Sequence, residues 1–199
     1  MKAMLKDAAI LFVITIIAGV LLGAVFQITK DPIARQEESA RKAACNEVFA
    51  SADSFEPFVG FDDIVAHAII SEKYPTQDIN DILVAKDASG NELGYVLTVT
   101  THEGYGGDIQ FMMGVTKGRV LNGISLLSIS ETAGLGMQAG DVLVPQFANK
   151  EVGEFTYTKN GATADNEVDA ISGATITTNA VVNGVNSGLY YVDYLLGGE

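Results

Sequence analysis

An uncharged apolar run, Ala8 to Phe26, limits what this chain can fold into more than any other feature of its sequence. As an α-helix rising about 1.5 Å per residue, the run is long enough to cross a hydrocarbon core of roughly 30 Å. A cleaved signal peptide is the alternative, but the run is long for a signal sequence and no Ala-x-Ala cleavage site follows it. We therefore expect an uncleaved membrane anchor with a single span.

The remainder of the chain is strongly acidic. Residues 27–199 keep 10 of the 12 basic residues and 24 of the 25 acidic ones, a formal net charge of −14. Proteins bind the phosphate backbone of nucleic acids through lysine and arginine, so we expect no nucleic-acid partner.

Basic residues flank the apolar run on both sides, with Lys2 and Lys6 before it and Lys30, Arg35 and Arg41 after it. The positive-inside count therefore does not fix the orientation of the span. The usual arrangement of a single anchor has a short N-terminus inside and a long domain outside. It predicts a cell-membrane protein with an extracytoplasmic domain.

Few residues of this chain suit metal or thiol chemistry. Cys45 is the one cysteine, and His67 and His102 are the two histidines. The chain therefore has no internal disulfide, no CxxC pair and no iron–sulfur ligand set, and we expect no metal site. Any redox chemistry needs an organic cofactor.

The apolar spacing predicts an α+β domain after the anchor. Asp31-Pro32 is typical of a helix start, and the helical pattern continues to about Ala50. From Asp81 the period changes to two, which predicts an antiparallel meander, and Thr177 to Leu196 returns to helical spacing, although Gly184 and Gly188 weaken that helix. The predicted strands are 81–86, 92–101, 108–116, 119–130 and 154–158, and the predicted parts are an anchor (1–28), a connecting helix (29–50) and a domain (51–199).

Three glycine-containing stretches are candidates for chemistry: Asp169–Thr178, Glu131–Met137 and Gly104–Gly107. The first places hydroxyls and small residues before a predicted helix, whose N-terminal N–H groups would seat a phosphate. An ordinary side-chain N-cap is the alternative. The glycine spacing of the second stretch is GxGxxxG, with no βαβ unit around it, so we exclude a Rossmann dinucleotide loop.

Together the stretches resemble an FMN-binding domain. It is shared by the G subunit of the Rnf ion-translocating ferredoxin:NAD oxidoreductase complex and the C subunit of the sodium-translocating NADH:quinone oxidoreductase. The family signature D-x-x-S/T-G-A-T matches Asp169–Thr175, E-T-P-G-L-G matches Glu131–Gly136 with Ala133 in place of proline, and G-Y-G-G matches Gly104–Gly107. The resemblance covers the whole chain, including the junction at Thr29–Ala34, and the chain length favours the Rnf protein.

The resemblance implies that Thr175 carries FMN through a phosphoester bond, with Thr177 and Thr178 as the nearest rival positions. No neighbouring His or Lys is placed to activate the hydroxyl, so we expect a flavin transferase that uses FAD and releases AMP. Met137 and Tyr105 offer the flavin ring apolar contact, with ordinary core packing as the alternative. The other cofactor-binding residues that the family positions imply are Asp169, Ser172, Gly173, Ala174, Thr177, Glu131, Thr132, Gly134, Leu135, Gly136, Tyr105, Gly106 and Gly107.

The implied function is electron relay within an Rnf-type complex, in contact with its other membrane and peripheral subunits. We expect no catalytic residues, because acid–base machinery is absent from the three stretches, and no ion path through a span without ionisable residues. The alternatives are the flavin subunit of a sodium-translocating quinone reductase, a lone flavoprotein carrier, or a cofactor-free membrane-anchored scaffold. The scaffold would be colourless and would tolerate Thr175→Ala.

Overall fold

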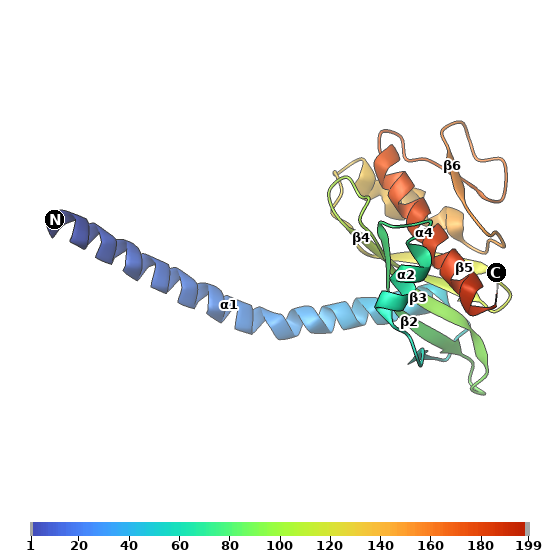
Figure 1. Ribbon diagram of the computed structural model, residues 1–199, viewed down its shortest axis with the longest axis horizontal. Helices are drawn as coiled ribbons and strands as arrows, with labels where there is room; N and C mark the ends of the chain where they lie inside the picture. The colour runs from blue at the N-terminus through green and yellow to red at the C-terminus, as the bar shows by residue number, and fades with distance from the viewer. Residues whose placement is uncertain (1, 198–199) are drawn as a thin grey trace. The chain divides into compact units, whose positions relative to one another are not determined.

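The computed structural model describes residues 2–197, which divide into two compact units between Arg41 and Lys42. Helix α1 (Lys2–Val48) forms the first unit and ends in the second. The second unit is an α+β domain, as the sequence predicts, and Figure 1 shows its sheet with helix α4 (Thr175–Leu195) across one face.

Helix α1 passes through Asp31 and Pro32 without interruption, so the prediction of a new helix start at this dipeptide is wrong. An interior proline lacks the N–H that bonds to the carbonyl four residues earlier, and it costs about 3 kcal/mol. The flanking segments are rich in alanine, leucine, glutamate and arginine, which propagate a helix well. Their combined preference outweighs the cost of one proline.

The first part of α1 is long and apolar enough to cross a membrane. Its apolar side chains are exposed, Leu22 at 73% and Phe26 at 61%, which suits hydrocarbon rather than water. The hydroxyls of its threonines bond within the helix: that of Thr15 donates to the carbonyl of Phe12 and that of Thr29 to Val25, each at 2.9 Å. These features are those of a membrane span.

Five antiparallel strands form the sheet of the domain, in the order β1-β2-β3-β4-β5. The alternating pattern predicts four of them correctly, whereas it misses β1, a four-residue strand that contains Pro57. Their bounds are β1 (Ser54–Pro57), β2 (Gln77–Lys86), β3 (Glu92–Thr101), β4 (Ile109–Thr116) and β5 (Leu121–Ser128).

Both faces of this sheet are covered, so β3 is buried almost throughout. Leu97 and Val99 belong to the cluster under α4 and α2 (Asp63–Ile70), whereas Val96 belongs to the cluster formed by the last turns of α1. This alternation is the period of a strand. A Cβ at Gly114 would overlap the backbone of Val48, so a glycine is required where α1 ends on the sheet.

The fifth predicted strand does not join the meander. Strand β6 (Thr156–Thr158) pairs in parallel with β7 (Glu167–Asp169) in a separate two-stranded sheet. Short helices η1 (Gly136–Gln138), α3 (Ala139–Val142) and η2 (Val144–Phe147) intervene between β5 and β6. A strand of three residues carries too little pattern to specify its partner, which here is set by tertiary contacts.

Helix α4 packs closely on β4, and its glycines are the reason. A Cβ at Gly184 would lie 2.9 Å from the ring of Phe111, and one at Gly188 would overlap the sulfur of Met113. The glycines that weaken the helix in the sequence therefore set the distance between the helix and the sheet.

Asn186 on α4 fixes the segment before β6. Its side chain accepts a hydrogen bond from the Phe155 N–H at 2.7 Å and donates to the Phe155 carbonyl at 2.9 Å, in a buried position.

Asn186→Ala leaves both backbone groups of Phe155 unpaired, so we expect a loss of about 2–4 kcal/mol in the free energy of unfolding. Thermal or denaturant unfolding of the full chain measures this. The exposed Asn160→Ala serves as control, and equal stability of the two variants would contradict the assignment.

Candidate functional site

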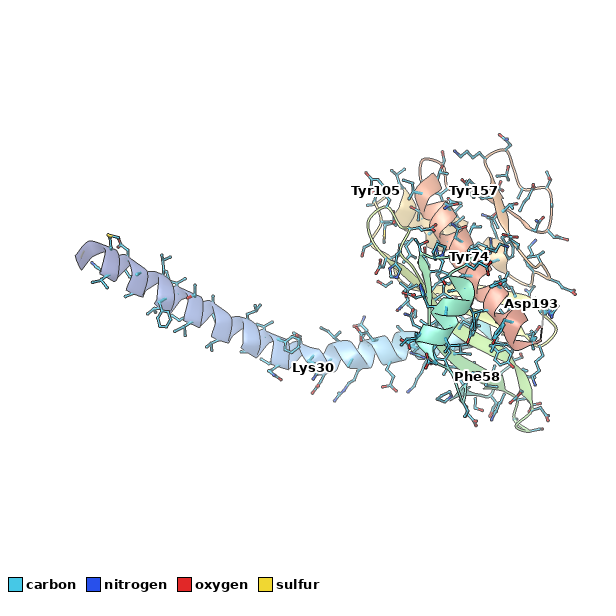
Figure 2. The ribbon with its side chains drawn as sticks, viewed as in Figure 1. Lys30, Phe58, Tyr74, Tyr105, Tyr157 and Asp193 are labelled. Atoms are coloured by element: carbon cyan, nitrogen blue, oxygen red, sulfur yellow. The ribbon has the colours of Figure 1, made fainter. Side chains whose placement is uncertain are left out.

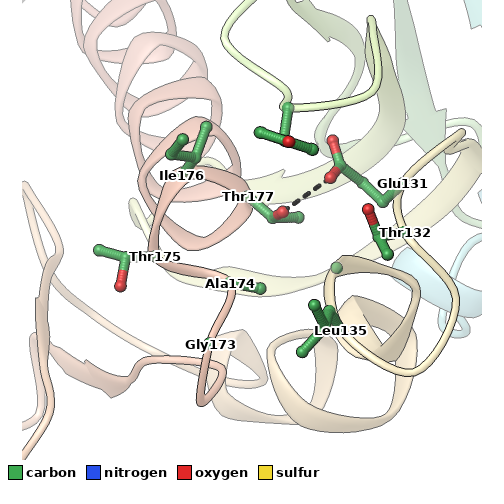
Figure 3. Close-up of a pocket in the computed structure, with 10 residues that line it drawn as sticks. Glu131, Thr132, Leu135, Gly173, Ala174, Thr175, Ile176 and Thr177 are labelled. Atoms are coloured by element: carbon green, nitrogen blue, oxygen red, sulfur yellow. Dashed lines mark hydrogen bonds between the residues drawn. The ribbon is translucent and has the colours of Figure 1, made fainter.

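The three glycine-containing stretches meet around one cavity of about 520 Å³ (Figure 3). This volume lies within the range of small-molecule sites, roughly 300–1,000 Å³. The cavity lies at the N-terminus of α4. Its lining residues are Tyr105, Glu131, Thr132, Leu135, Gly136, Gly173, Ala174, Thr175, Ile176 and Thr177.

The carboxylate of Glu131 joins the three stretches. Its Oε1 accepts a hydrogen bond from the Gly106 N–H at 3.1 Å. Its Oε2 accepts one from the Thr177 hydroxyl at 2.9 Å, which Figure 3 shows as a dashed line. Each oxygen therefore holds a different segment against the loop that follows β5. Hydrogen bonds to a charged acceptor are stronger than neutral ones.

Glycines make this close approach to Glu131 possible. A Cβ at Gly136 would lie 2.6 Å from the Thr177 hydroxyl oxygen and 2.7 Å from Glu131 Oε2. A Cβ at Gly106 would overlap the Ser130 carbonyl oxygen, and one at Gly104 would lie 2.8 Å from Glu131 Oε1. The glycines in these stretches are therefore packing requirements of the Glu131 junction.

Two further glycines of these stretches have a left-handed backbone, and Gly173 lines the cavity. Gly134 and Gly173 have φ values of +76° and +77°, in the left-handed region that glycine adopts without strain. The Leu135 side chain lies 3.1 Å from the position of a Cβ at Gly173, so the second and first stretches are in contact.

The start of α4 has no side-chain cap, so an ordinary N-cap does not explain the hydroxyls of the signature. The N-cap residue is Ala174, and Thr178 instead accepts from the Ile171 N–H at 3.1 Å and donates to the Ala174 carbonyl at 3.0 Å. Within the described residues, the N–H groups of Thr175, Ile176 and Thr177 have no protein acceptor. These N–H groups, at the positive end of a 21-residue helix, are suited to an anion.

The three threonines of this turn differ in accessibility. The Thr178 hydroxyl is buried and doubly bonded, and the Thr177 hydroxyl is held by Glu131. Thr175 is partly exposed, and its hydroxyl has no hydrogen-bond partner among residues 2–197. Figure 3 shows its side chain on the opposite side of the start of α4 from Glu131.

Some of the predicted site residues do not line the cavity. Asp169 belongs to β7, and its Oδ1 accepts from the Ala162 N–H at 2.8 Å, so it holds the loop after β6. Ser172 is exposed. The other predicted residues that do not line the cavity are Gly106, Gly107, Gly134 and Met137. Gly106 nevertheless donates its N–H to Glu131.

Neither of the two side chains proposed for ring contact is in the core. Tyr105 is 70% exposed and projects from the domain surface (Figure 2), and Met137 is 45% exposed. The sequence reasoning missed Ile176, which is 53% exposed and lines the cavity. Ile176 directly follows Thr175, the last residue of the signature, and this position could have indicated it. Tyr105, Leu135 and Ile176 give the cavity an apolar rim.

The reported relatives match this chain over most of its length. The G subunit of the Na(+)-translocating ferredoxin:NAD(+) oxidoreductase complex from Acetobacterium woodii is 32% identical over 188 residues, which are 93% of this chain and 89% of the relative. This chain belongs to that family of G subunits. The G subunit of the ion-translocating oxidoreductase complex from Methanosarcina acetivorans is 31% identical and is matched over 96% of this chain and 95% of its own length.

Two family models match separate parts of the chain. The model of the RnfG N-terminal region matches residues 1–48, where α1 ends. The model of the FMN-binding domain matches residues 104–190, a range that contains all three glycine stretches. The family is thus a membrane-anchored one with an FMN-binding domain.

Solved structures share the fold. The C subunit of the Na(+)-translocating NADH-quinone reductase from Parabacteroides distasonis has a TM-score of 0.57 at 19% identity, covering 84% of this chain and 96% of that chain. NqrC from Shewanella oneidensis has a TM-score of 0.56 at 14% identity, covering 82% of this chain and 96% of that chain. At these identities the likeness concerns the fold.

The residues at the cavity fit FMN. The unpartnered N–H groups of the first turn of α4 suit its phosphate, and the hydroxyl of Thr175 lies at the same turn. The apolar rim formed by Tyr105, Leu135 and Ile176 suits its aromatic ring.

The Glu131 junction can be tested by substitution. Glu131→Ala removes both hydrogen bonds, so we expect a loss of about 1–2 kcal/mol in the free energy of unfolding and faster amide exchange at residues 104–107. Glu131→Gln keeps one acceptor oxygen, so its effect is expected to be intermediate. Glu151→Ala, at an exposed carboxylate, is the control. Unchanged exchange at 104–107 in Glu131→Ala would show that the junction does not hold this loop.

Proposed function

We propose that this chain is a membrane-anchored electron-transfer subunit that carries FMN in a phosphoester bond to Thr175, within an Rnf-type complex. The observation that supports it most is the difference among the three threonines of the signature. Thr177 and Thr178 use their hydroxyls inside the fold, whereas the hydroxyl of Thr175 is accessible at the mouth of the cavity.

The proposed attachment is a phosphoryl transfer from FAD. The Thr175 Oγ–P bond forms, the pyrophosphate bond of FAD breaks, AMP leaves, and the hydroxyl proton passes to a base. A threonine hydroxyl is a weak nucleophile at neutral pH, and no described titratable side chain forms a hydrogen bond with Thr175. A separate flavin transferase therefore supplies the base and the donor.

Different residues at the cavity would hold the phosphate and the ring of the cofactor. The N–H groups at the start of α4 would bind the phosphoryl oxygens, and the positive end of the helix dipole would stabilise their charge. Leu135, Tyr105 and Ile176 would contact the ring, while Glu131 positions the loops that carry Tyr105 and Leu135. FMN supplies one- and two-electron transfer, which no side chain of this chain provides.

Covalent attachment suits a domain of this charge. Residues 27–199 carry a net charge of −14, so a free anionic FMN would be repelled. The ester keeps the flavin at a high local concentration without a deep pocket. We propose that the domain lies on the extracytoplasmic side, where lost flavin would not be replaced.

The other subunits of the complex are the proposed donors and acceptors of the electrons. The relatives from Acetobacterium and Methanosarcina are named as subunits of such complexes. Residues 8–26 contain no ionisable side chain, so the ion path is assigned to partner subunits. The flavin subunit of a quinone reductase is the second candidate, favoured only by the fold shared with the NqrC structures.

The attachment residue is tested by matched substitutions. Thr175→Val keeps the β-branched shape but removes the hydroxyl, so we expect no flavin fluorescence after denaturation and no added mass of one FMN less water. Thr175→Ser keeps a hydroxyl and is expected to retain part of the label. Intact mass and peptide mapping, on protein made in a host with the transferase, measure both. Flavin that persists in Thr175→Val, mapped to Ser172 or Thr177, would overturn the assignment.

The side of the membrane is tested by cysteine labelling. The one native cysteine, Cys45, is buried, so it contributes little background. A cysteine introduced by Asn160→Cys, in the exposed turn after β6, is expected to react with a membrane-impermeant maleimide in intact spheroplasts. Labelling that requires lysis would place the domain in the cytoplasm.

A further inference from the structure

A second cluster of ionisable side chains lies at the base of the loop that carries Tyr105 and Gly106. Strand β3 ends at Thr101 and β4 begins at Ile109, so residues 102–108 form the connection. The ring of His102 lies between two carboxylates. Its Nδ1 is 2.8 Å from Asp108 Oδ1 and its Nε2 is 2.8 Å from Asp78 Oδ2.

This geometry requires a doubly protonated ring. A carboxylate accepts hydrogen bonds, and a neutral imidazole has one N–H to donate, so both contacts are satisfied only by an imidazolium. The hydrogen bonds to Asp78 and then Asp108 raise the pKa of His102, while the hydrogen bond from His102 lowers the pKa of Asp78.

The other ionisable groups around the ring have partners of their own. His67 on α2 bonds through Nδ1 to Asp78 Oδ1 at 2.8 Å, and so shares that carboxylate with His102. Glu103, next in the chain, accepts from Asn179 at 3.2 Å and Asn183 at 2.7 Å on α4, and also from the Thr76 hydroxyl. The charged groups facing His102 are therefore Asp78 and Asp108, with His67 behind the first.

Asp78, His102 and Asp108 close the connection at both of its ends. His102 is its first residue and Asp108 its last; His102 contacts Asp108 through Nδ1 and, through Nε2, Asp78 on β2. From this base the loop reaches α4 through Glu103 and reaches Glu131 through the Gly106 N–H. The loop that carries the cavity-lining Tyr105 is thus held at residues 102 and 108, at Glu103 and at Gly106.

We propose that His102 is a positioning residue of the flavin site. As an imidazolium between Asp78 and Asp108, it clasps the base of residues 103–107 and holds Tyr105 and the Gly106 N–H at the cavity. The consequence for flavin rests on the proposed function, whereas the clasp itself does not depend on flavin.

The clasp makes the order of the loop depend on pH. A histidine whose folded pKa is raised contributes stability that is fully present below its unfolded pKa, about 6.5. That contribution is lost as the pH rises through the higher folded pKa, because the neutral ring can donate to only one of the two carboxylates. The loop is therefore ordered on the acidic side and loosens above the folded pKa of His102.

The test measures histidine C2–H exchange and backbone amide exchange on the full chain in detergent, between about pH 6 and 9. The chain has two histidines, so the His67→Gln variant assigns the remaining C2–H signal to His102. We expect a pKa of His102 above 6.5, the ordinary value. Amide exchange at 103–107, corrected for intrinsic rates, is expected to rise about fivefold through that pKa, the factor for one half-exposed charged hydrogen bond.

Matched variants separate the clasp from a general structural effect. His102→Gln is expected to show the faster exchange at every pH, and Asp108→Asn to abolish most of the pH dependence. His67→Gln, which removes the other histidine on Asp78, is expected to leave the exchange at 103–107 unchanged. Exchange that is independent of pH in the wild type, or that responds equally to His67→Gln, would overturn the proposal.

The effect of His102 on bound flavin is measured in a separate experiment. In the flavin-loaded chain, acrylamide quenching of flavin fluorescence is expected to increase through the same pKa and to lose this step in His102→Gln. The exchange measurement is repeated on Thr175→Val. If no flavin is ever found, the proposed function fails while the clasp is still tested. If flavin is present and quenching shows no step, His102 does not position its site.

Discussion

The carboxylate of Glu131 is the contact on which the site depends. Its two oxygens hold Gly106 and Thr177, which lie 25 and 46 residues away in the sequence. The fold must bring a strand connection, a glycine loop and the start of a helix to one point, and glycines at 104, 106 and 136 are needed for the approach. Once that junction forms, the hydroxyl of Thr177 is occupied and the hydroxyl of Thr175 is left accessible.

The rest of the domain supports this junction. The five-stranded sheet carries the end of α1 on one face and α4 on the other, with Gly114 and Gly184 allowing both helices to approach closely (Figure 1). Because α4 is buried along most of its length, its N-terminus would hold the proposed phosphate on a well-packed element. A carrier that must present one cofactor repeatedly to different partners benefits from such rigidity at the attachment point and from an exposed apolar rim.

Much of the fold follows from local pattern, and most of the site's geometry does not. The alternation in residues 81–101 and 108–130 predicts strands β2 to β5, and the glycine stretches indicate which loops matter. The position of the segment before β6 depends on Asn186, which is distant in the sequence. Which of the three threonine hydroxyls stays accessible depends on the bonds of Thr177 to Glu131 and of Thr178 to Ile171. The His102 clasp joins residues 24 apart in the sequence, and no local spacing reveals it.

We propose that the three glycine stretches form one flavin site with its phosphate at Thr175. A cryo-electron microscopy map of the flavin-loaded chain in its complex would locate both the phosphate and the ring. We expect phosphate density continuous with the Thr175 side chain at the start of α4, and ring density in the cavity beside Leu135 and Tyr105. A phosphate joined to another residue, or a ring that contacts neither loop, would contradict it.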